Sequence, residues 1–112
     1  NDGETIAADF LRKAGYKILA QKYRARVGEI DIVAYKKGTY SFVEVKTRSG
    51  LKYGTPAEAV TAGKQRKIIS TAWCFLRQSG AEDVPMCFDV MEVFLLPDGS
   101  AKCNHIINAF GG

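Results

Sequence analysis

Acidic and basic side chains occupy alternate positions in two neighbouring segments of the chain. Glu29 and Asp31 lie in the first segment, and Glu44 and Lys46 lie in the second. Residues two apart in a β-strand share a face, so each pair would point to one side of its strand. Carboxylates on a shared face suit Mg²⁺, which binds one or two carboxylates, keeps several waters and also takes phosphate oxygens. A lysine beside them could hold an attacking water or offset charge that builds on a phosphate.

A hairpin would bring the two segments together. Strands are predicted at Gly28–Tyr35 and Tyr40–Arg48, because both segments are rich in Ile, Val, Phe and Tyr and flank a Lys-Lys-Gly-Thr turn. If the hairpin is symmetric about that turn, Asp31 faces Glu44 and Glu29 faces Lys46. Side chains paired in this way have Cβ atoms roughly 5 Å apart, and two like charges there destabilise the sheet.

An acid that faces an acid in the middle of a sheet needs compensation. The two carboxylates could share one proton, or they could bind a divalent cation. The alternative interpretation is a solvent-facing hairpin whose charges have no function, with Glu29 and Lys46 as a simple cross-strand ion pair. A turn longer or shorter by one residue would also move the pairing.

The remaining pattern predicts the elements that hold this hairpin. A helix is expected over residues 4–14, an extended segment over 16–24, and a second helix from the capping box Thr55–Glu58 to Gln78, with Gly63 as a potential break. Strands are expected at Met86–Leu96 and Ala101–Ile107. The order is therefore α-β-β-β-α-β-β, an α/β domain with a central mixed sheet flanked by helices, spanning residues 1–112.

Most other side chains of chemical interest have a structural explanation. The apolar faces Ile30-Ile32-Ala34 and Val43-Val45 are expected in the core, as is the aromatic Trp73. Asp89 is expected to make structural hydrogen bonds, and His105 to be an ordinary strand residue.

Charge and cysteine usage narrow the partners and the compartment. Of the 16 Lys and Arg residues, all but Lys102 lie between residues 10 and 77, and a segment this basic suits a phosphate-bearing partner. Charge alone also fits a solvated basic face. No run of about 18 apolar residues or signal peptide is visible, so we expect a cytoplasmic protein that does not span a membrane. Three cysteines cannot all pair, and we expect free thiols.

The two strand motifs resemble a known nuclease signature. Residues 28–34 read Gly-Glu-Ile-Asp-Ile-Val-Ala and residues 42–46 read Phe-Val-Glu-Val-Lys, which resembles the PD-(D/E)xK pattern of metal-dependent nucleases. The whole chain resembles the YraN family of small bacterial proteins with a restriction-endonuclease-like fold. Further matching features are Gly15-Tyr16, Arg24, Lys64, Phe88-Asp89-Val90 and the closing residues 105–110.

This resemblance implies roles for individual residues. Asp31 and Glu44 would bind Mg²⁺ or Mn²⁺, with the Val45 carbonyl as a further ligand, and Lys46 would position or activate the hydrolytic water. Glu4 resembles an extra acid that archaeal Holliday-junction resolvases place on their first helix. Its alternative explanation is that a glutamate favours the N-terminal end of a helix through the macrodipole.

Two hypotheses about function follow. The first is an endonuclease that hydrolyses DNA phosphodiester bonds, with branched or junction DNA as candidate substrates, and with a dimer expected on a two-fold symmetric junction. The second is a non-catalytic module that binds nucleic acid or docks on a protein partner. Glu29 is a further candidate for the acidic site. The candidate phosphate contacts are basic residues: Arg24, Arg26, Arg48, Lys64, Arg66 and Lys67.

Overall fold

The computed structural model describes residues 2–49 and 60–111 of the chain. Its elements are, in order, α1 (Asp2–Lys13), β1 (Lys17–Ala25), β2 (Gly28–Lys36), β3 (Thr39–Ser49), α2 (Ala62–Gln78), β4 (Met86–Leu95) and β5 (Ala101–Phe110). This sequence of elements confirms the predicted α-β-β-β-α-β-β order. The predicted capping box at residues 55–58 lies outside the described residues, and α2 begins at Ala62 with Thr61 as its N-cap.

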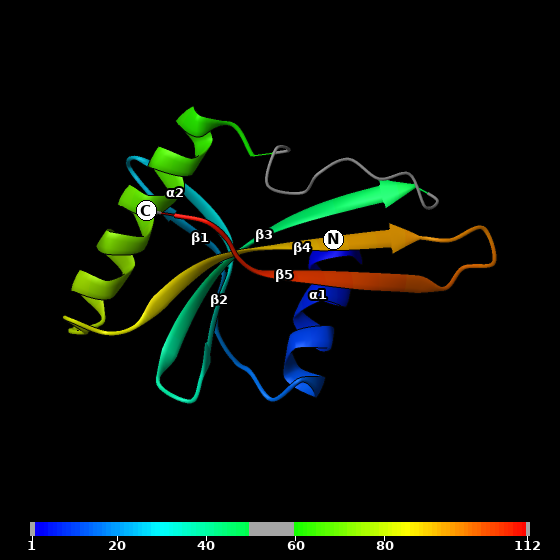
Figure 1. Cartoon of the computed structure of the whole chain (residues 1–112), viewed down its shortest axis with the longest axis horizontal. Coiled ribbons are helices and arrows are strands. Elements are labelled where there is room, and N and C mark those ends of the chain that lie inside the picture. Colours follow the sequence, from blue (N-terminus) through cyan, green and yellow to red (C-terminus); the bar gives the residue numbers. More distant parts are fainter. Residues whose placement is uncertain (1, 50–59, 112) are drawn as a thin grey trace.

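The five strands form one sheet in the order of the chain (Figure 1). β3 and β4 are parallel and the other neighbours are antiparallel, so the sheet is mixed as predicted. Between β2 and β3 the pairs run from Lys36–Thr39 to Ile32–Val43, which is the predicted register. The tight turn explains it: Lys37 and Gly38 have φ values of 49° and 85°, the positive values that a two-residue hairpin turn of type I′ requires.

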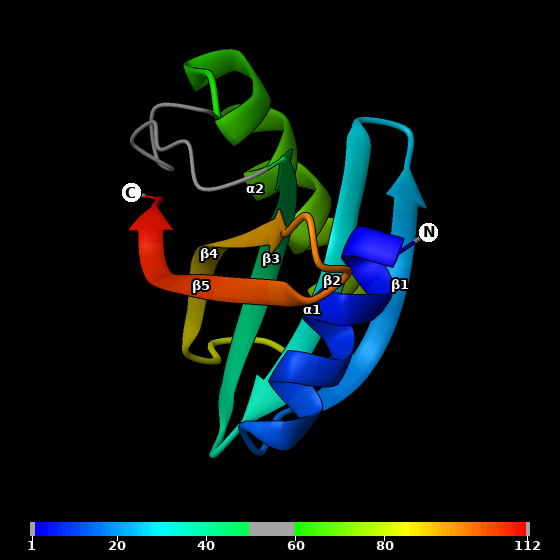
Figure 2. The ribbon, with the colours of Figure 1, turned by 90° about the vertical axis from the view of Figure 1, so that its right-hand side faces the viewer.

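The two helices cover opposite faces of the sheet (Figure 2). The core around α1 includes Leu11, Ile32 and Val43, while the core around α2 includes Val33 and Phe42. Both faces of the central strands are therefore buried, because each carries a helix. The prediction of a core on one face of the hairpin was too narrow, since Val33 and Phe42 are buried on the face opposite that of Ile32 and Val43.

Two sequence-based expectations about single residues have different outcomes. Trp73 was predicted to belong to the core, but 51 % of its surface is exposed, because it lies on the outer face of α2. The three cysteines have free thiols, as expected.

Over residues 2–49 and 60–111, no helix has both the length and the apolar character needed to cross a bilayer.

Candidate active site

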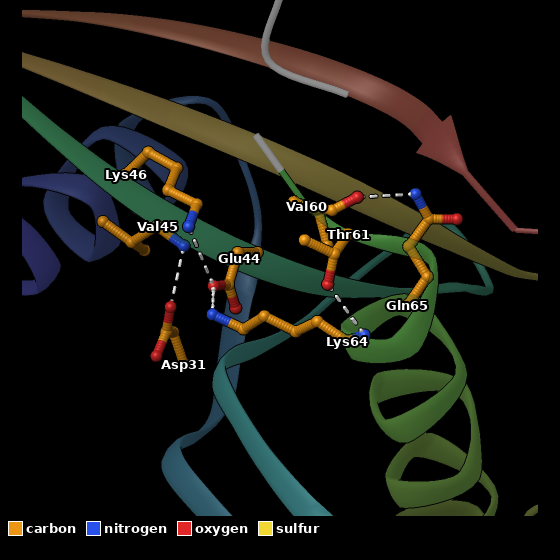
Figure 3. Close-up of polar contacts among 8 residues, drawn as sticks. All are labelled: Asp31, Glu44, Val45, Lys46, Val60, Thr61, Lys64 and Gln65. Carbon is orange, nitrogen blue, oxygen red and sulfur yellow. Dashed lines mark hydrogen bonds and ion pairs between the residues drawn. The ribbon is translucent and has the colours of Figure 1, made fainter. Parts of the chain in front are cut away.

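Asp31 lies where the pairing between β2 and β3 stops. The last paired residues are Ile32 and Val43, and beyond them the backbone N–H of Val45 donates to Asp31 Oδ2 at 2.8 Å (Figure 3). A side-chain carboxylate thus replaces the backbone acceptor of a continuing ladder. In a β-strand the N–H and C=O of one residue point toward the same neighbouring strand. The Val45 carbonyl, predicted as a metal ligand, therefore faces the same side of β3 as Asp31.

The surroundings of Asp31 favour its protonated form. Burial is the largest cause, and together with the charges of Glu44 and Glu4 it raises the pKa of Asp31 to about 7. The hydrogen bond from the Val45 N–H acts in the opposite direction, since it stabilises the carboxylate. The acid-on-acid repulsion predicted from the hairpin register is present, and Asp31 is the group that responds to it.

Glu44 is held between two lysines. Its side chain is 5 % exposed, and its Oε2 accepts a hydrogen bond from Lys64 Nζ and lies 3.7 Å from Lys46 Nζ (Figure 3). A buried carboxylate needs such partners, because an unpaired charge inside a protein is costly. The contact with Glu44 raises the pKa of Lys64, so this lysine stays charged.

Lys64 reaches the site from the first turn of α2, and Thr61 fixes that turn. The Thr61 hydroxyl accepts a hydrogen bond from the Lys64 N–H at 3.2 Å, and the Gln65 side chain donates to the Val60 carbonyl at 2.8 Å (Figure 3). The sequence suggested Lys64 only as a phosphate contact. Its contact with Glu44 could not be predicted, because it joins residues from two elements whose packing is not visible in the sequence.

Glu4 places a third carboxylate at the site. Its charge contributes to the raised pKa of Asp31, and its Oε1 is buried without a hydrogen-bond partner among the described residues. A buried acceptor left unpaired costs about 1–3 kcal/mol of stability, so a buried glutamate oxygen without a partner is best explained by a ligand or a functional role. The preference of an acid for a helix N-terminus does not by itself account for a buried oxygen beside another acid.

These groups fit a divalent cation in the chemistry of their donors. Asp31, Glu44 and Glu4 supply hard oxygen ligands, and one Glu4 oxygen has no partner. In the described part of the chain, no group of three or more His, Cys, Asp or Glu side chains is placed to hold a metal ion. Mg²⁺ does not require three such ligands, because it binds through one or two carboxylates, retains waters and takes substrate phosphate oxygens.

Glu29 pairs with a base on β1 instead of with Lys46, although its charge still contributes to the raised pKa of Lys64. It pairs across β1 with Arg24, whose Nε donates to Glu29 Oε2 at 2.9 Å, and both side chains are substantially exposed. The expected position opposite Lys46 was wrong, because the pairing of β2 with β3 ends before Glu29. Arg24, expected as a phosphate contact, is therefore already occupied by an acid.

Arg48 is also paired, with an acid that the sequence analysis missed. Arg48 Nε lies 3.5 Å from Glu92 Oε2, and Glu92 is 1 % exposed on β4, where its other oxygen accepts from Asn104. Glu92 lies within the apolar run of β4. One signal was available, since a lone acid in such a run needs a partner on a neighbouring strand.

The remaining basic candidates lie together. Arg26, Arg66 and Lys67 line an open cavity of about 550 Å³ between the β1–β2 turn and the first turns of α2, together with Val27, Gly63 and Ser70. Backbone phosphates are the ligands that such a basic hollow suits.

A second polar cluster stabilises the sheet away from these residues. Asp89 is fully buried and accepts hydrogen bonds from the Asn108 N–H at 2.9 Å, while His105 Nε2 lies 2.7 Å from its other oxygen. These contacts bridge an irregularity in the β4–β5 register. Asp89 therefore makes the structural hydrogen bonds expected of it, and His105 is its partner rather than an ordinary strand residue.

Known proteins resemble this chain over most of its length. A family model described as "Uncharacterised protein family UPF0102" matches residues 3–93. A UPF0102 protein of Symbiobacterium thermophilum is 52 % identical over 108 residues, which cover 96 % of this chain and 92 % of that protein. One of Caldanaerobacter subterraneus is 44 % identical over 110 residues, covering 96 % and 90 %. A solved structure of Archaeoglobus fulgidus Hjc, a Holliday junction resolvase, matches with a TM-score of 0.48 and 24 % identity, covering 92 % of this chain and 72 % of that one.

Proposed function

This chain belongs to the uncharacterised protein family UPF0102, the YraN family that its motifs resemble, and we propose that it is a divalent-metal-dependent endonuclease acting on DNA. One observation carries the proposal: Asp31 is buried where two strands separate, within electrostatic range of two further carboxylates, Glu44 and Glu4. Asp31 has its pKa raised to about 7, and Glu4 keeps a buried oxygen without a partner among the described residues. A cation would offset both.

In this proposal each residue has a distinct task. Asp31, Glu44 and the Val45 carbonyl would hold Mg²⁺ or Mn²⁺, and the Glu4 carboxylate would add negative charge nearby. The ion would stabilise charge on the scissile phosphate and lower the pKa of the attacking water. Lys46, whose ammonium lies 3.7 Å from Glu44 Oε2, would orient that water and offset the charge that develops on the phosphate.

Lys64 acts on the same carboxylate in two situations. Without a cation it neutralises Glu44, which it contacts directly. With a cation bound at Glu44, the half-exposed lysine would be free to contact a substrate phosphate. The cavity lined by Arg26, Arg66 and Lys67 then holds a neighbouring backbone phosphate without reading the sequence.

A non-catalytic nucleic-acid-binding module is the competing function, and the lysine contacts of Glu44 favour it. Two ammonium groups already compensate that carboxylate, so the fold does not depend on a cation at Glu44. Such a module would bind DNA through the same basic cavity and cut nothing.

Cleavage assays separate the two functions. Duplex, flapped and four-way branched DNA are incubated with wild type and with Asp31→Asn, with Mn²⁺, Mg²⁺ or EDTA. An endonuclease cuts at least one substrate only with a divalent cation, and Asp31→Asn abolishes the cutting while binding persists. Asp9→Asn, which changes an exposed acid on α1, serves as the matched control and stays active. Binding without any metal-dependent product, at high enzyme concentration and with every substrate, contradicts the proposal.

A further inference from the structure

The outer face of α2 carries a regular row of exposed side chains. Arg66, Ser70, Trp73 and Arg77 follow one another at intervals of three or four residues and are all exposed. Side chains at this spacing lie one above another on a helix. Figure 1 shows α2 along one side of the molecule. We call these four residues the α2 stripe.

The charge of α2 is one-sided. The helix contains Lys64, Arg66, Lys67 and Arg77 but no acidic residue, and three of its four bases lie near its N-terminal end. Cations there oppose the helix macrodipole, which favours acids at that end. Lys64 is explained by its contact with Glu44, whereas the two bases beside it line the open cavity of about 550 Å³. This arrangement is complementary to a polyanion.

Trp73 lies between Arg66 and Arg77 on this helix. Its side chain is 51 % exposed and lines two hollows of about 320 and 420 Å³. An exposed indole flanked by arginines is the combination that binds single-stranded nucleic acid, because any base can stack on the ring while cations hold the phosphates. Arg77, at the far end of the stripe, lines the same hollow as Trp73.

The stripe overlaps the basic cavity. Arg66 and Ser70 belong both to the stripe and to the cavity of about 550 Å³. Arg66 and Trp73 are separated by about 10 Å along the helix axis at 1.5 Å per residue, and a stacked strand covers that distance in about three nucleotides. Glu82 and Asp83 line the same hollow as Trp73 and Arg77 and mark the end of the basic surface.

We propose that the α2 stripe binds an unpaired nucleic-acid strand, with one base stacked on Trp73 and the backbone of the strand in the basic cavity. This inference rests on the proposed function and narrows its substrate to nucleic acid with a single-stranded segment. Flaps, gaps and unpaired arms at branches provide such a segment. A continuous duplex does not, because its bases are stacked on one another and cannot meet the indole.

The fluorescence of Trp73 can report on base stacking directly, because Trp73 is the single tryptophan in the sequence. An oligo-dT of about twelve nucleotides, within the range of single-strand site sizes, is titrated into wild-type protein in EDTA, which prevents cleavage. Binding is followed in parallel by anisotropy of a labelled oligonucleotide. The stacked base quenches the indole emission with the same saturation curve as the anisotropy. A blunt duplex of equal length raises the anisotropy with little quenching.

Variants test the energetic contribution of the ring. Trp73→Ala weakens oligo-dT binding about five- to 150-fold, the range for loss of one stacked base, while Trp73→Phe retains most of the affinity. Duplex binding changes much less. Ile107→Ala, which truncates another exposed apolar side chain on β5, is the matched control and binds both ligands like wild type. Thermal melts establish that each variant is folded.

The outcomes distinguish this inference from the proposed function. Oligo-dT binding without quenching, or equal losses of single-strand and duplex affinity in Trp73→Ala, overturns the inference and leaves the endonuclease intact. Trp73 would then belong to a surface for a protein partner or contribute to stability alone. Quenching with no metal-dependent cleavage supports the stripe and contradicts the endonuclease. Absence of binding to any nucleic acid overturns both.

Discussion

Removal of one negative charge from the acidic site should stabilise the metal-free protein. Asp31→Asn keeps the size of the side chain and an oxygen that can accept the Val45 N–H, now at 2.8 Å from Asp31. It removes the repulsion with Glu44 and Glu4 that, together with burial, raises the pKa of Asp31 from 3.8 to about 7. The substitution therefore isolates the charge from the packing.

The pKa sets the magnitude and the pH range. A difference of one in pKa corresponds to about 1.4 kcal/mol, so ionised Asp31 costs about 4 kcal/mol, or about 2–3 kcal/mol after discounting for its partial exposure. Because the folded-state pKa is raised, the favourable contribution of protonated Asp31 is complete below pH of about 4 and is lost as the pH rises through about 7. At pH 8 the Asn variant should melt about 8–12 °C higher than wild type, at about 4 °C per kcal/mol. At pH 4 the two should coincide.

Thermal melts at pH 4 and pH 8, with and without Mn²⁺, measure this effect. At pH 8 a saturating cation stabilises wild type by RT ln(1 + [L]/Kd), which is about 2.7 kcal/mol at one hundred times Kd. Asp31→Asn should lose most of that gain. Asp9→Asn, an exposed acid paired with Arg12 on α1, should show neither change. If wild type and Asp31→Asn melt together at pH 8, or if Mn²⁺ stabilises both equally, the electrostatic account of the site is refuted.

Three further predictions follow from other contacts. Lys64→Met removes the ammonium group that contacts Glu44 and should lower the metal-free stability by about 1–2 kcal/mol, less than for a fully buried pair because Lys64 is half-exposed. It should also enlarge the stabilisation that Mn²⁺ gives. Lys67→Met on the same helix is the control, and equal melting temperatures of the two variants would contradict the role of the Lys64–Glu44 contact. Arg66→Ala should reduce the steepness of log K against log[salt] by about 0.9, where K is the association constant for DNA. If titrations between low and physiological salt give the wild-type slope, Arg66 does not contact a phosphate. Asp89→Ala leaves the Asn108 N–H and His105 without their acceptor and should lower the free energy of unfolding, measured in urea at neutral pH, by about 3 kcal/mol. An unchanged unfolding midpoint would contradict this prediction.

The hairpin could be predicted because its information is local. The alternation of charged and apolar residues defines β2 and β3, and the short turn at Lys37-Gly38 sets the register to within one residue. A register error of one residue would have moved Asp31 to the opposite face of the sheet. The pairing of β3 with β4 is parallel and spans a long connection, and no local pattern specifies which strands meet in that way.

The errors concern residues whose partners come from other elements. Glu29 was placed opposite Lys46 because the hairpin was extended beyond its last pair, whereas β1 supplies Arg24 on the other side. Glu92 was missed because its neighbours on β4 are apolar. Trp73 is different, since the helical phase relative to Arg66 and Arg77 already placed it on the exposed face. Its residue type outweighed the periodicity in that prediction, although the periodicity carried the correct information.

The acidic site and the α2 stripe are connected by the way α2 is attached to the sheet. Thr61 caps the helix at the turn from which Lys64 reaches Glu44, so the position of α2 is coupled to the charge state of the site. A ligand that replaces Lys64 at Glu44 releases one tether of α2, whereas the core contacts of Ile68, Ala72 and Leu76 keep the helix on the sheet. The stripe therefore retains its orientation while the first turn adjusts. A strand bound along Trp73 and Arg77 would therefore keep a fixed direction relative to the sheet, while Lys64, half a turn away around the helix, responds to the charge of the site.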